Sequence, residues 1–457
     1  METPYKKLCI KILLITFLLI SLVRFLSYMN YFCQKSLQMD FSAYYTAGQS
    51  LNNGLSIYEN NIIHDPLIWD GVAFCKYSRF LYAPLVGTFF RPLAHLPYRV
   101  AKYIWMFFNL LLILLAMIIA ADIIKIEKSV QNYLAIGIFL LLFHPLLIYF
   151  ERGQIDVVTL VLIIFAFKLM FGGNKQRFIA GTLIAVATLI KLNCLYLVPF
   201  LLIKRKWFVI YGIGAGLITL LLLSSLFNGP GNTMDYFMKE LPRIAKYGEE
   251  LPKSMWLPTT VVKRQSTTPR NQASKDGVTY QLTAFQFVAN ASLTRELSYL
   301  TNKRNQNLSR SIISLVLISV FIILILVHYR KAKERSMQNS PSQEFLFWQS
   351  ILIIVLLTSP LTWVMNTVWL LPIIVILIKM FPLLHSKKQA IYFCLCAVGL
   401  IIAALPEHLS FSLTIPYGIS FINYKYLISQ IILVIALIGM HSSMILNSTG
   451  QNSRKPL

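Results

Sequence analysis

Apolar stretches, each about long enough to cross a membrane, recur along the whole chain. A membrane-spanning helix needs roughly 20 mainly apolar residues, and "LCIKILLITFLLISLVRFLSY" near the N-terminus is the first such stretch. Hydrophobic residues make up 56% of the 457 residues and charged residues only 13%. A soluble fold of this length could not bury so much apolar surface. We therefore expect an all-α polytopic membrane protein.

The apolar stretches predict about twelve membrane segments within a single transmembrane domain, residues 1–457. The first stretch lacks a small-residue cleavage site, so we expect it to be retained as a helix and not removed as a signal peptide. Residues 177–203 are too long for one crossing, and Lys191 interrupts them, which favours two short segments broken there. The other expected spans are 9–29, 101–122, 133–150, 154–172, 207–227, 309–328, 345–359, 362–380, 388–405 and 423–445.

The basic residues indicate the orientation of these spans. The net charge is +24, but most basic residues lie in short clusters between apolar runs, as orientation signals do, and not on a nucleic-acid-binding surface. With the N-terminus in the cytoplasm, the clusters "KRK" and "RKAKER" both fall inside. We therefore expect both termini in the cytoplasm, in the cell inner (cytoplasmic) membrane. Two long loops then face outward, 30–100 and 228–308.

The first outer loop begins with the stretch "MDFSAYYTAGQSL". Its composition predicts a helix along the membrane surface that breaks at Asn53-Gly54. A second stretch, "LYAPLVGTFFRPLAHLPYRVAKYIWMFF", is aromatic and apolar with three prolines, which indicates an interfacial position. The loop at 228–308 is expected to form a cap or lid.

Asp40 stands directly outside the first apolar stretch. One interpretation is a solvated helix cap. The other is a functional carboxylate, because ionisable groups beside the bilayer core are costly and tend to be used. Glu59, Asp65 and Asp70 are rival acids in the same loop, but lie farther from the expected membrane surface.

Three other polar segments interrupt the apolar pattern. In "ERGQID", the side chains of Arg152, Gln154 and Asp156 either make a polar turn or face a cavity. Lys191 either snorkels to the surface or binds an anionic group such as a lipid phosphate, because broken helices at membrane depth line cavities. "SPLTWVMN" is by itself typical of a proline-marked turn with an interfacial tryptophan.

Absent motifs narrow the functional class. No P-loop, GxSxG or HExxH motif occurs, so ATP use, serine hydrolase and zinc protease chemistry are unsupported. No inverted repeat of the transporter type is evident. The first outer loop also lacks a DxD pair, which argues against a metal-bound diphosphate donor.

Five segments, in order, resemble glycosyltransferase family 87 of the GT-C superfamily. They are "MDFSAYYTAGQSLNNGLSIYE", "FLYAPLVGTFFRPLAHLPYRVAKYIWMFFN", "ERGQIDVVTL", "IAGTLIAVATLIKLNCLYLVPFLLIKRKW" and "SPLTW". Two positions depart from the family pattern. Family members often have histidine after Ser-Pro-x-x-Trp, where this chain has Met365-Asn366, and the family's Asn-Gln-Ser-Leu segment is reduced to Gln281 in "TYQLTAFQF".

The resemblance implies a GT-C-type fold and transfer of a sugar from a polyprenyl-phosphate donor to a lipid or glycan acceptor at the outer membrane face. Mannose is the expected sugar, although relatives also use arabinofuranose. We expect inversion at the sugar with Asp40 as general base, and no metal or other cofactor. Lys191 is expected to bind the donor phosphate, helped by Arg152, Gln154 and Asn366. The expected substrate contacts are Tyr44, Tyr45, Tyr82, Asp156, Trp363 and Gln281.

A lipid or oligosaccharide transporter is the alternative function. A transporter would also have many helices and a basic cavity. However, the large outer loops and the single carboxylate of this chain would then have no explanation. Only the enzyme would form a new glycosidic bond.

Overall fold

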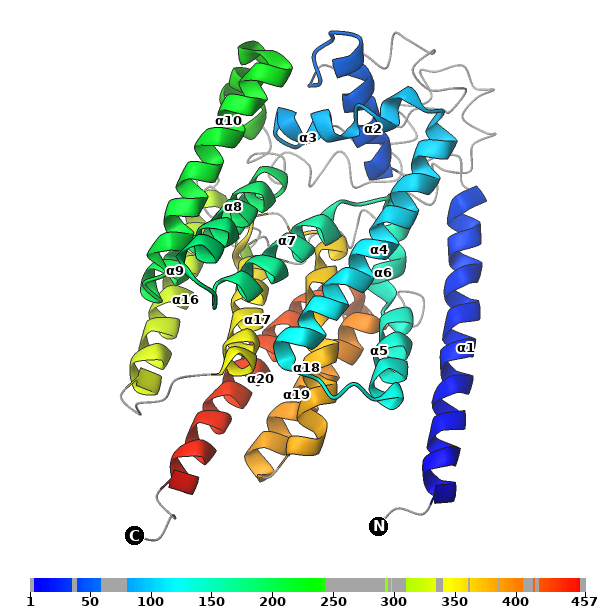
Figure 1. Cartoon of the computed structure of the whole chain (residues 1–457), viewed down its shortest axis with the longest axis vertical. Helices are drawn as coiled ribbons and strands as arrows, with labels where there is room; N and C mark the ends of the chain where they lie inside the picture. Colours follow the sequence, from blue (N-terminus) through cyan, green and yellow to red (C-terminus); the bar gives the residue numbers. More distant parts are fainter. Residues whose placement is uncertain are drawn as a thin grey trace.

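The computed structural model is a bundle of helices that run mostly along one direction (Figure 1). It describes residues 4–34, 39–58, 80–242, 292–294, 297, 310–333, 340–360, 362–384, 386–405, 414–415 and 419–452. The α-helices are α1 Pro4–Gln34, α2 Met39–Asn52, α3 Pro84–Phe90, α4 Tyr98–Ile124, α5 Val130–Leu142, α6 His144–Arg152, α7 Asp156–Leu169, α8 Asn174–Ile190, α9 Val198–Ile203, α10 Trp207–Asp235, α16 Arg310–Lys333, α17 Pro341–Thr358, α18 Pro372–Met380, α19 Lys387–Ala404 and α20 Phe421–Asn452.

Short elements connect or extend these helices. The 3-10 helices are η3 Leu93–His95, η4 Leu192–Leu197, η6 Val364–Leu370 and η7 Phe381–Leu383, and η5 Tyr236–Glu240 is a π-helix. One antiparallel pair of two-residue strands, β1 Thr414–Ile415 and β2 Ile419–Ser420, precedes α20, with Thr414 opposite Ser420. Within the described ranges the fold is thus helical apart from this pair.

Seven helices of the described chain are long and apolar enough to cross a membrane. The number becomes eight if α5 and α6, bent by 58°, form one broken span. The expectation of an all-α polytopic membrane protein is therefore confirmed. The count of twelve stays a prediction, because helices such as α7, with 14 residues, rise only about 21 Å at 1.5 Å per residue, less than the ~30 Å hydrocarbon core.

The chain breaks at Lys191 as the sequence predicts. Helix α8 ends at Ile190, Lys191 is extended with φ −139° and ψ 104°, and η4 follows. The next span is expected to end at residue 227, and α10 is broken by a kink two residues later. Gly229 adopts the non-helical φ +79° and ψ 150°, and helical structure resumes from Pro230 to Asp235. That residues 228–308 form an outer loop stays a prediction.

Helices α8 and α10 pack with their backbones in close contact. A Cβ atom at Gly181 would lie 2.0 Å from the Val209 carbonyl oxygen, and one at Gly212 would lie 2.1 Å from that of Phe178. Small residues at such positions let membrane helices approach closely. The contact fixes α8, and with it Lys191, against α10.

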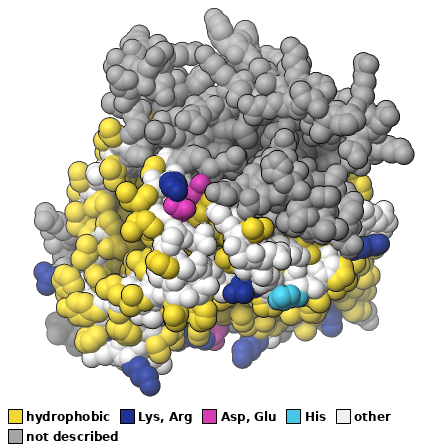
Figure 2. Space-filling view, turned by 90° about the horizontal axis from the view of Figure 1, so that it is seen from above, with side chains coloured by type: hydrophobic (Ala, Val, Ile, Leu, Met, Phe, Trp, Pro, Cys, Tyr) yellow, Lys and Arg dark blue, Asp and Glu magenta, His cyan; other side chains and the backbone are white. Residues whose placement is uncertain are grey.

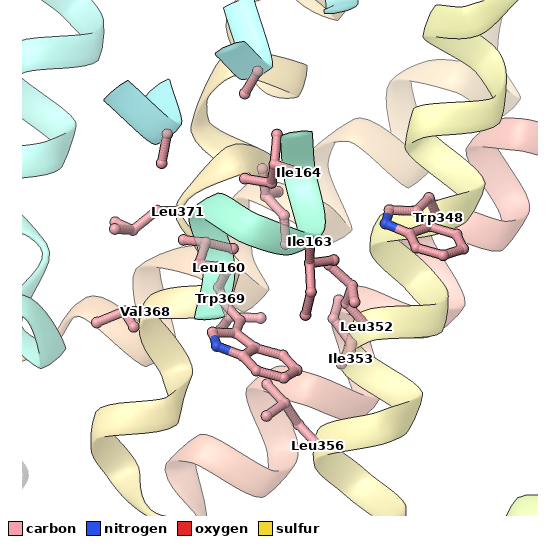
Figure 3. Packing of buried hydrophobic residues seen from close by; sticks show 14 of the residues in the cluster. Leu160, Ile163, Ile164, Trp348, Leu352, Ile353, Leu356, Val368, Trp369 and Leu371 are labelled. Atoms are coloured by element: carbon pink, nitrogen blue, oxygen red, sulfur yellow. The ribbon is translucent and has the colours of Figure 1, made fainter. Parts of the chain in front are cut away.

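The core of the bundle is built around α17. Its side chains from Phe345 to Thr358 are all buried. Figure 3 shows apolar side chains of α7, α17 and η6 that belong to this core, Trp369 among them. Seen from above in Figure 2, hydrophobic side chains cover much of the described periphery. Large exposed residues such as Leu222 and Leu226 suit contact with lipid.

Helix α1 lies at the edge of the bundle (Figure 1). Lys102 of α4 donates from Nζ to the Cys33 carbonyl oxygen at 3.0 Å, so a cation caps the C-terminal end of α1. Arg24 Nη1 donates to the Leu141 carbonyl oxygen at 3.2 Å. These two contacts join α1 to α4 and α5.

An aromatic cluster beside the bundle holds α2 and α3 together with the start of α4. The rings of Tyr44 and Phe90 stack with centroids 4.9 Å apart, and Phe41 stacks on Trp105 at 6.1 Å. Helix α2 ends at Asn52, and Gly54 has φ +68°, which confirms the predicted break. The aromatic cluster fixes the position of Asp40 in the first turn of α2.

Candidate active site

The "ERGQID" segment forms a tight junction between α6 and α7. Gly153 ends α6 with φ +70°, a left-handed conformation that favours glycine. Its carbonyl oxygen accepts a hydrogen bond from Trp105 Nε1 at 2.8 Å. The junction therefore presents Arg152, Gln154 and Asp156 from a fixed backbone.

Asp40 is bound by two side chains of this junction. Arg152 donates two hydrogen bonds to the Asp40 carboxylate, from Nε to Oδ2 at 2.6 Å and from Nη2 to Oδ1 at 3.0 Å. Gln154 Nε2 donates to Oδ2 at 2.6 Å. The side chains of Arg152 and Asp40 are only 18% and 13% exposed. Charge-assisted, two-pronged pairs of this kind are strong and directional.

Two tyrosines extend the network from Gln154. Tyr44 donates from its hydroxyl to Gln154 Oε1 at 3.2 Å, and the hydroxyls of Tyr44 and Tyr82 are 3.0 Å apart. Burial, reinforced by Tyr82 and the charge of Asp40, raises the pKa of Tyr44 well above its usual value. Burial and the charge of Asp156 likewise raise the pKa of Tyr82. Both phenols stay neutral at physiological pH, so they donate hydrogen bonds but do not act as bases.

Asp156 and Lys191 form a second, deeper ion pair. Lys191 Nζ lies 2.9 Å from Asp156 Oδ1, and the side chains are 15% and 0% exposed. Asp156 stands at the N-terminus of α7 and Lys191 at the C-terminus of α8, where the helix dipoles favour an anion and a cation respectively. Within the described chain, Oδ2 of Asp156 is buried without a hydrogen bond.

Asn366 links the "SPLTW" segment to this ion pair. Its Nδ2 donates to Asp156 Oδ1, while its Oδ1 accepts from the backbone N–H of Trp363 at 2.6 Å. Trp369 Nε1 also donates to the Asp156 carbonyl oxygen at 3.4 Å. Asn366, which was expected to bind the donor phosphate, thus donates in this structure to the carboxylate of Asp156.

The structure brings most of the predicted site residues together, but not all. Asp40, Arg152, Gln154, Tyr44 and Tyr82 form one network, and Asp156, Lys191 and Asn366 form a second one on the same junction. Tyr45 points elsewhere, donating to the Leu96 carbonyl oxygen at 2.8 Å. Gln281 and the rival acids Glu59, Asp65 and Asp70 lie outside the described residues.

Sequence reasoning missed three residues that support the junction. Besides the Trp105 contact, Asn109 Nδ2 donates to the Trp105 carbonyl oxygen at 2.9 Å, and the Tyr149 hydroxyl donates to Asn109 Oδ1. Asn109 is fully buried, with 1% exposure, in the span formed by α4. An asparagine four residues after a tryptophan in an apolar run was the available signal.

The chemistry open to this cluster follows from its groups. It offers a carboxylate in the first turn of α2, two cations for an anionic group, and neutral amide and phenol donors for hydroxyl groups. Among the described residues, no three His, Cys, Asp or Glu side chains gather as metal ligands. That the protein needs no metal stays a prediction.

Comparison with known proteins identifies the family. The sequence model of glycosyltransferase family 87 matches residues 80–360, more than half of the chain. No curated protein matches this chain. The matched residues include Arg152, Gln154, Asp156 and Lys191, whereas Asp40 lies before them. The chain belongs to glycosyltransferase family 87 and is a multi-pass membrane glycosyltransferase, which acts on a sugar donor and an acceptor in a membrane.

Proposed function

We propose that the protein transfers a sugar, with mannose as the first candidate, from a polyprenyl-phosphate donor to a lipid or glycan acceptor. The reaction takes place at the outer face of the cell inner membrane, with both termini in the cytoplasm and without a metal. The observation that carries this proposal is the joined network of Asp40, Arg152 and Gln154, next to the Lys191–Asp156 pair at the ends of apolar helices.

A lipid-linked donor brings its phosphate to the level where apolar helices end. The Lys191 side chain is 15% exposed and offers a point charge, while the Arg152 guanidinium fits phosphate oxygens with two donors. The two cations supply the charge that stabilises a phosphate leaving group as negative charge develops on it. Asn366 has no charge to add, and its amide supports Asp156 instead.

The transfer step needs a base for the acceptor hydroxyl. The acceptor oxygen forms a bond to the anomeric carbon while the bond from that carbon to the phosphate oxygen breaks. Polyprenyl phosphate leaves with the electron pair, and Asp40 takes the hydroxyl proton. Attack opposite a β-linked phosphate gives an α-glycoside. A positioned base of this kind contributes about 10²–10⁴-fold to the rate.

The remaining polar side chains divide by exposure. Tyr82 and Trp363 are partly exposed, and we assign them to sugar contacts. Tyr44 and Gln154 are buried, and we assign them to the hydrogen-bond network that supports Tyr82. Asp156 is fully buried, so we assign it to holding Lys191 and not to substrate contact. Tyr45 is buried and hydrogen-bonded to the backbone, and we assign it to the support of α2.

The test is a transfer assay on the purified full-length protein in nanodiscs. Labelled polyprenyl-phosphate mannose and arabinofuranose are supplied with candidate lipid and glycan acceptors, and the products are analysed by mass spectrometry. We expect Asp40→Asn to abolish transfer while still binding the donor. The control Asp122→Asn removes an acid from an exposed pair with Lys168 and should keep full activity. Substantial turnover by Asp40→Asn would refute the assignment of the base.

A further inference from the structure

The two ion pairs of the candidate site differ in how deeply their acids are buried. Asp156 is 0% exposed next to Lys191, whereas Asp40 is 13% exposed and its partner Arg152 is 18% exposed. A fully buried acid stripped of its cation is strongly disfavoured, because nothing replaces the lost charge. An acid at the edge of solvent keeps contact with water. Lys191 is therefore fixed, and Arg152 is able to change partner.

A second hydrogen-bond donor, Gln154, would still bind the Asp40 carboxylate if Arg152 moved away. Gln154 Nε2 lies 2.6 Å from Oδ2. The Tyr44 hydroxyl donates to Gln154 Oε1 at 3.2 Å, which fixes the amide with its NH₂ group toward Asp40. Arg152 Nη2 binds the other oxygen, Oδ1. Departure of the guanidinium would leave Oδ2 oriented by Gln154 and would remove the Arg152 donor from Oδ1.

A phosphate and a carboxylate compete for the same guanidinium. The fork of Arg152 now uses Nε and Nη2 on Asp40. Phosphate oxygens accept from the same pair of donors with similar geometry. A donor phosphate that binds this Nε–Nη2 edge therefore displaces Asp40 from at least one of these two nitrogens.

We propose, on the basis of the function proposed above, that Arg152 exchanges partners in each catalytic cycle. It pairs with Asp40 in the resting enzyme and with the donor phosphate when the donor is bound, while Lys191 keeps Asp156 throughout. The exchange makes and breaks no covalent bond. Its consequence is that the Arg152 guanidinium leaves Oδ1 of Asp40 only when a sugar donor is in place, while Gln154 keeps Oδ2 oriented and so acts as the positioning residue for the base.

The test measures binding without chemistry. Purified full-length protein in nanodiscs is titrated with polyprenyl phosphate, with inorganic phosphate and with uncharged polyprenol, so that lipid and free phosphate are distinguished. In the wild type Asp40 competes for Arg152, so Asp40→Asn should bind polyprenyl phosphate about 10- to 100-fold more tightly, the value of a charge-assisted hydrogen bond. The double variant Asp40→Asn/Arg152→Gln should lose this gain, and polyprenol binding should not change.

Controls separate the exchange from a general charge effect. Asp235→Asn removes an acid from the exposed pair with Lys239 and should leave binding unchanged. If Asp40→Asn does not fold, Asp40→Ser takes its place. Equal or weaker binding by the folded Asp40 variant, or a gain that persists without Arg152, overturns the exchange. Failure of every protein, wild type included, to bind polyprenyl phosphate overturns the proposed function, and the exchange with it.

Discussion

Replacing Lys191 by methionine should destabilise the protein more than replacing Asp156 by asparagine. Lys191→Met leaves the Asp156 carboxylate, which is 0% exposed, without its cation. Asp156→Asn instead leaves Lys191 without its acid, and this side chain is 15% exposed, so the ammonium can keep part of its hydration. Breaking a buried pair costs about 3–5 kcal/mol. We assign the upper end, ~5 kcal/mol, to Lys191→Met and the lower end, ~3 kcal/mol, to Asp156→Asn.

The double variant Asp156→Asn/Lys191→Met removes both charges together. Its asparagine keeps a carbonyl oxygen that can accept from Asn366, as Asp156 Oδ1 does. Because a neutral, well-packed replacement of a buried pair is often tolerated, we expect a loss of only about 1 kcal/mol for the double variant, the scale of one hydrogen bond. The two single effects would thus be strongly non-additive.

The assay is reversible unfolding of each variant in mixed micelles by denaturing detergent, with the free energy of unfolding compared across the four proteins. The pair Asp122–Lys168, whose side chains are 61% and 46% exposed, is the control, and breaking it should cost at most about 1 kcal/mol. Additivity within about 0.5 kcal/mol, or a larger loss for Asp156→Asn than for Lys191→Met, would refute this reasoning.

Three further predictions concern packing, hydrogen bonding and pH. Gly181→Ala places a Cβ atom 2.0 Å from the Val209 carbonyl oxygen, so the free energy of unfolding should fall by about 1–3 kcal/mol. The control Gly214→Ala, whose Cβ atom would have no neighbouring atom within 4 Å, should be tolerated. Tyr45→Phe should lower the free energy of unfolding by about 1 kcal/mol and leave the transfer rate unchanged, because its hydroxyl donates to the Leu96 carbonyl oxygen and accepts from Gln49 Nε2, contacts that support α2. Because the pKa of Tyr44 is raised in the folded protein, its phenol contributes stability below about pH 10 that is lost as the pH rises further. Unfolding by denaturing detergent at rising pH should therefore show a smaller fall in the free energy of unfolding for Tyr44→Phe than for the wild type.

The parts of the fold that the sequence predicts are those governed by local chemistry. Asn53-Gly54 ends α2 because glycine accepts a positive φ, and Lys191 breaks an apolar run too long for one crossing. The span expected to end at residue 227 has a kink at Gly229, and glycine followed by proline is typical both of a kink and of the start of a loop. Helical structure resumes after the kink and includes the buried Tyr236.

The pairings within the site were beyond the reach of the sequence. Arg152 and Asp40 are 112 residues apart, and Asn366 and Asp156 are 210 apart. Residue type indicates that a cation binds an anion, but not which anion. Adjacent residues Tyr44 and Tyr45 point in different directions because successive positions on a helix lie about 100° apart. One therefore contacts Gln154 and the other the Leu96 backbone.

The glycine contact between α8 and α10 has a consequence for the order in which the protein is assembled during synthesis. Residues 156–216 contain this contact and both members of the Asp156–Lys191 pair, while Asn366 emerges from the ribosome much later. Contacts between neighbouring segments close early because little chain entropy is lost. We expect the acid and the lysine to enter the bilayer already neutralising each other. Nascent chains that end before α16 should then already protect Lys191 from amine-reactive labels.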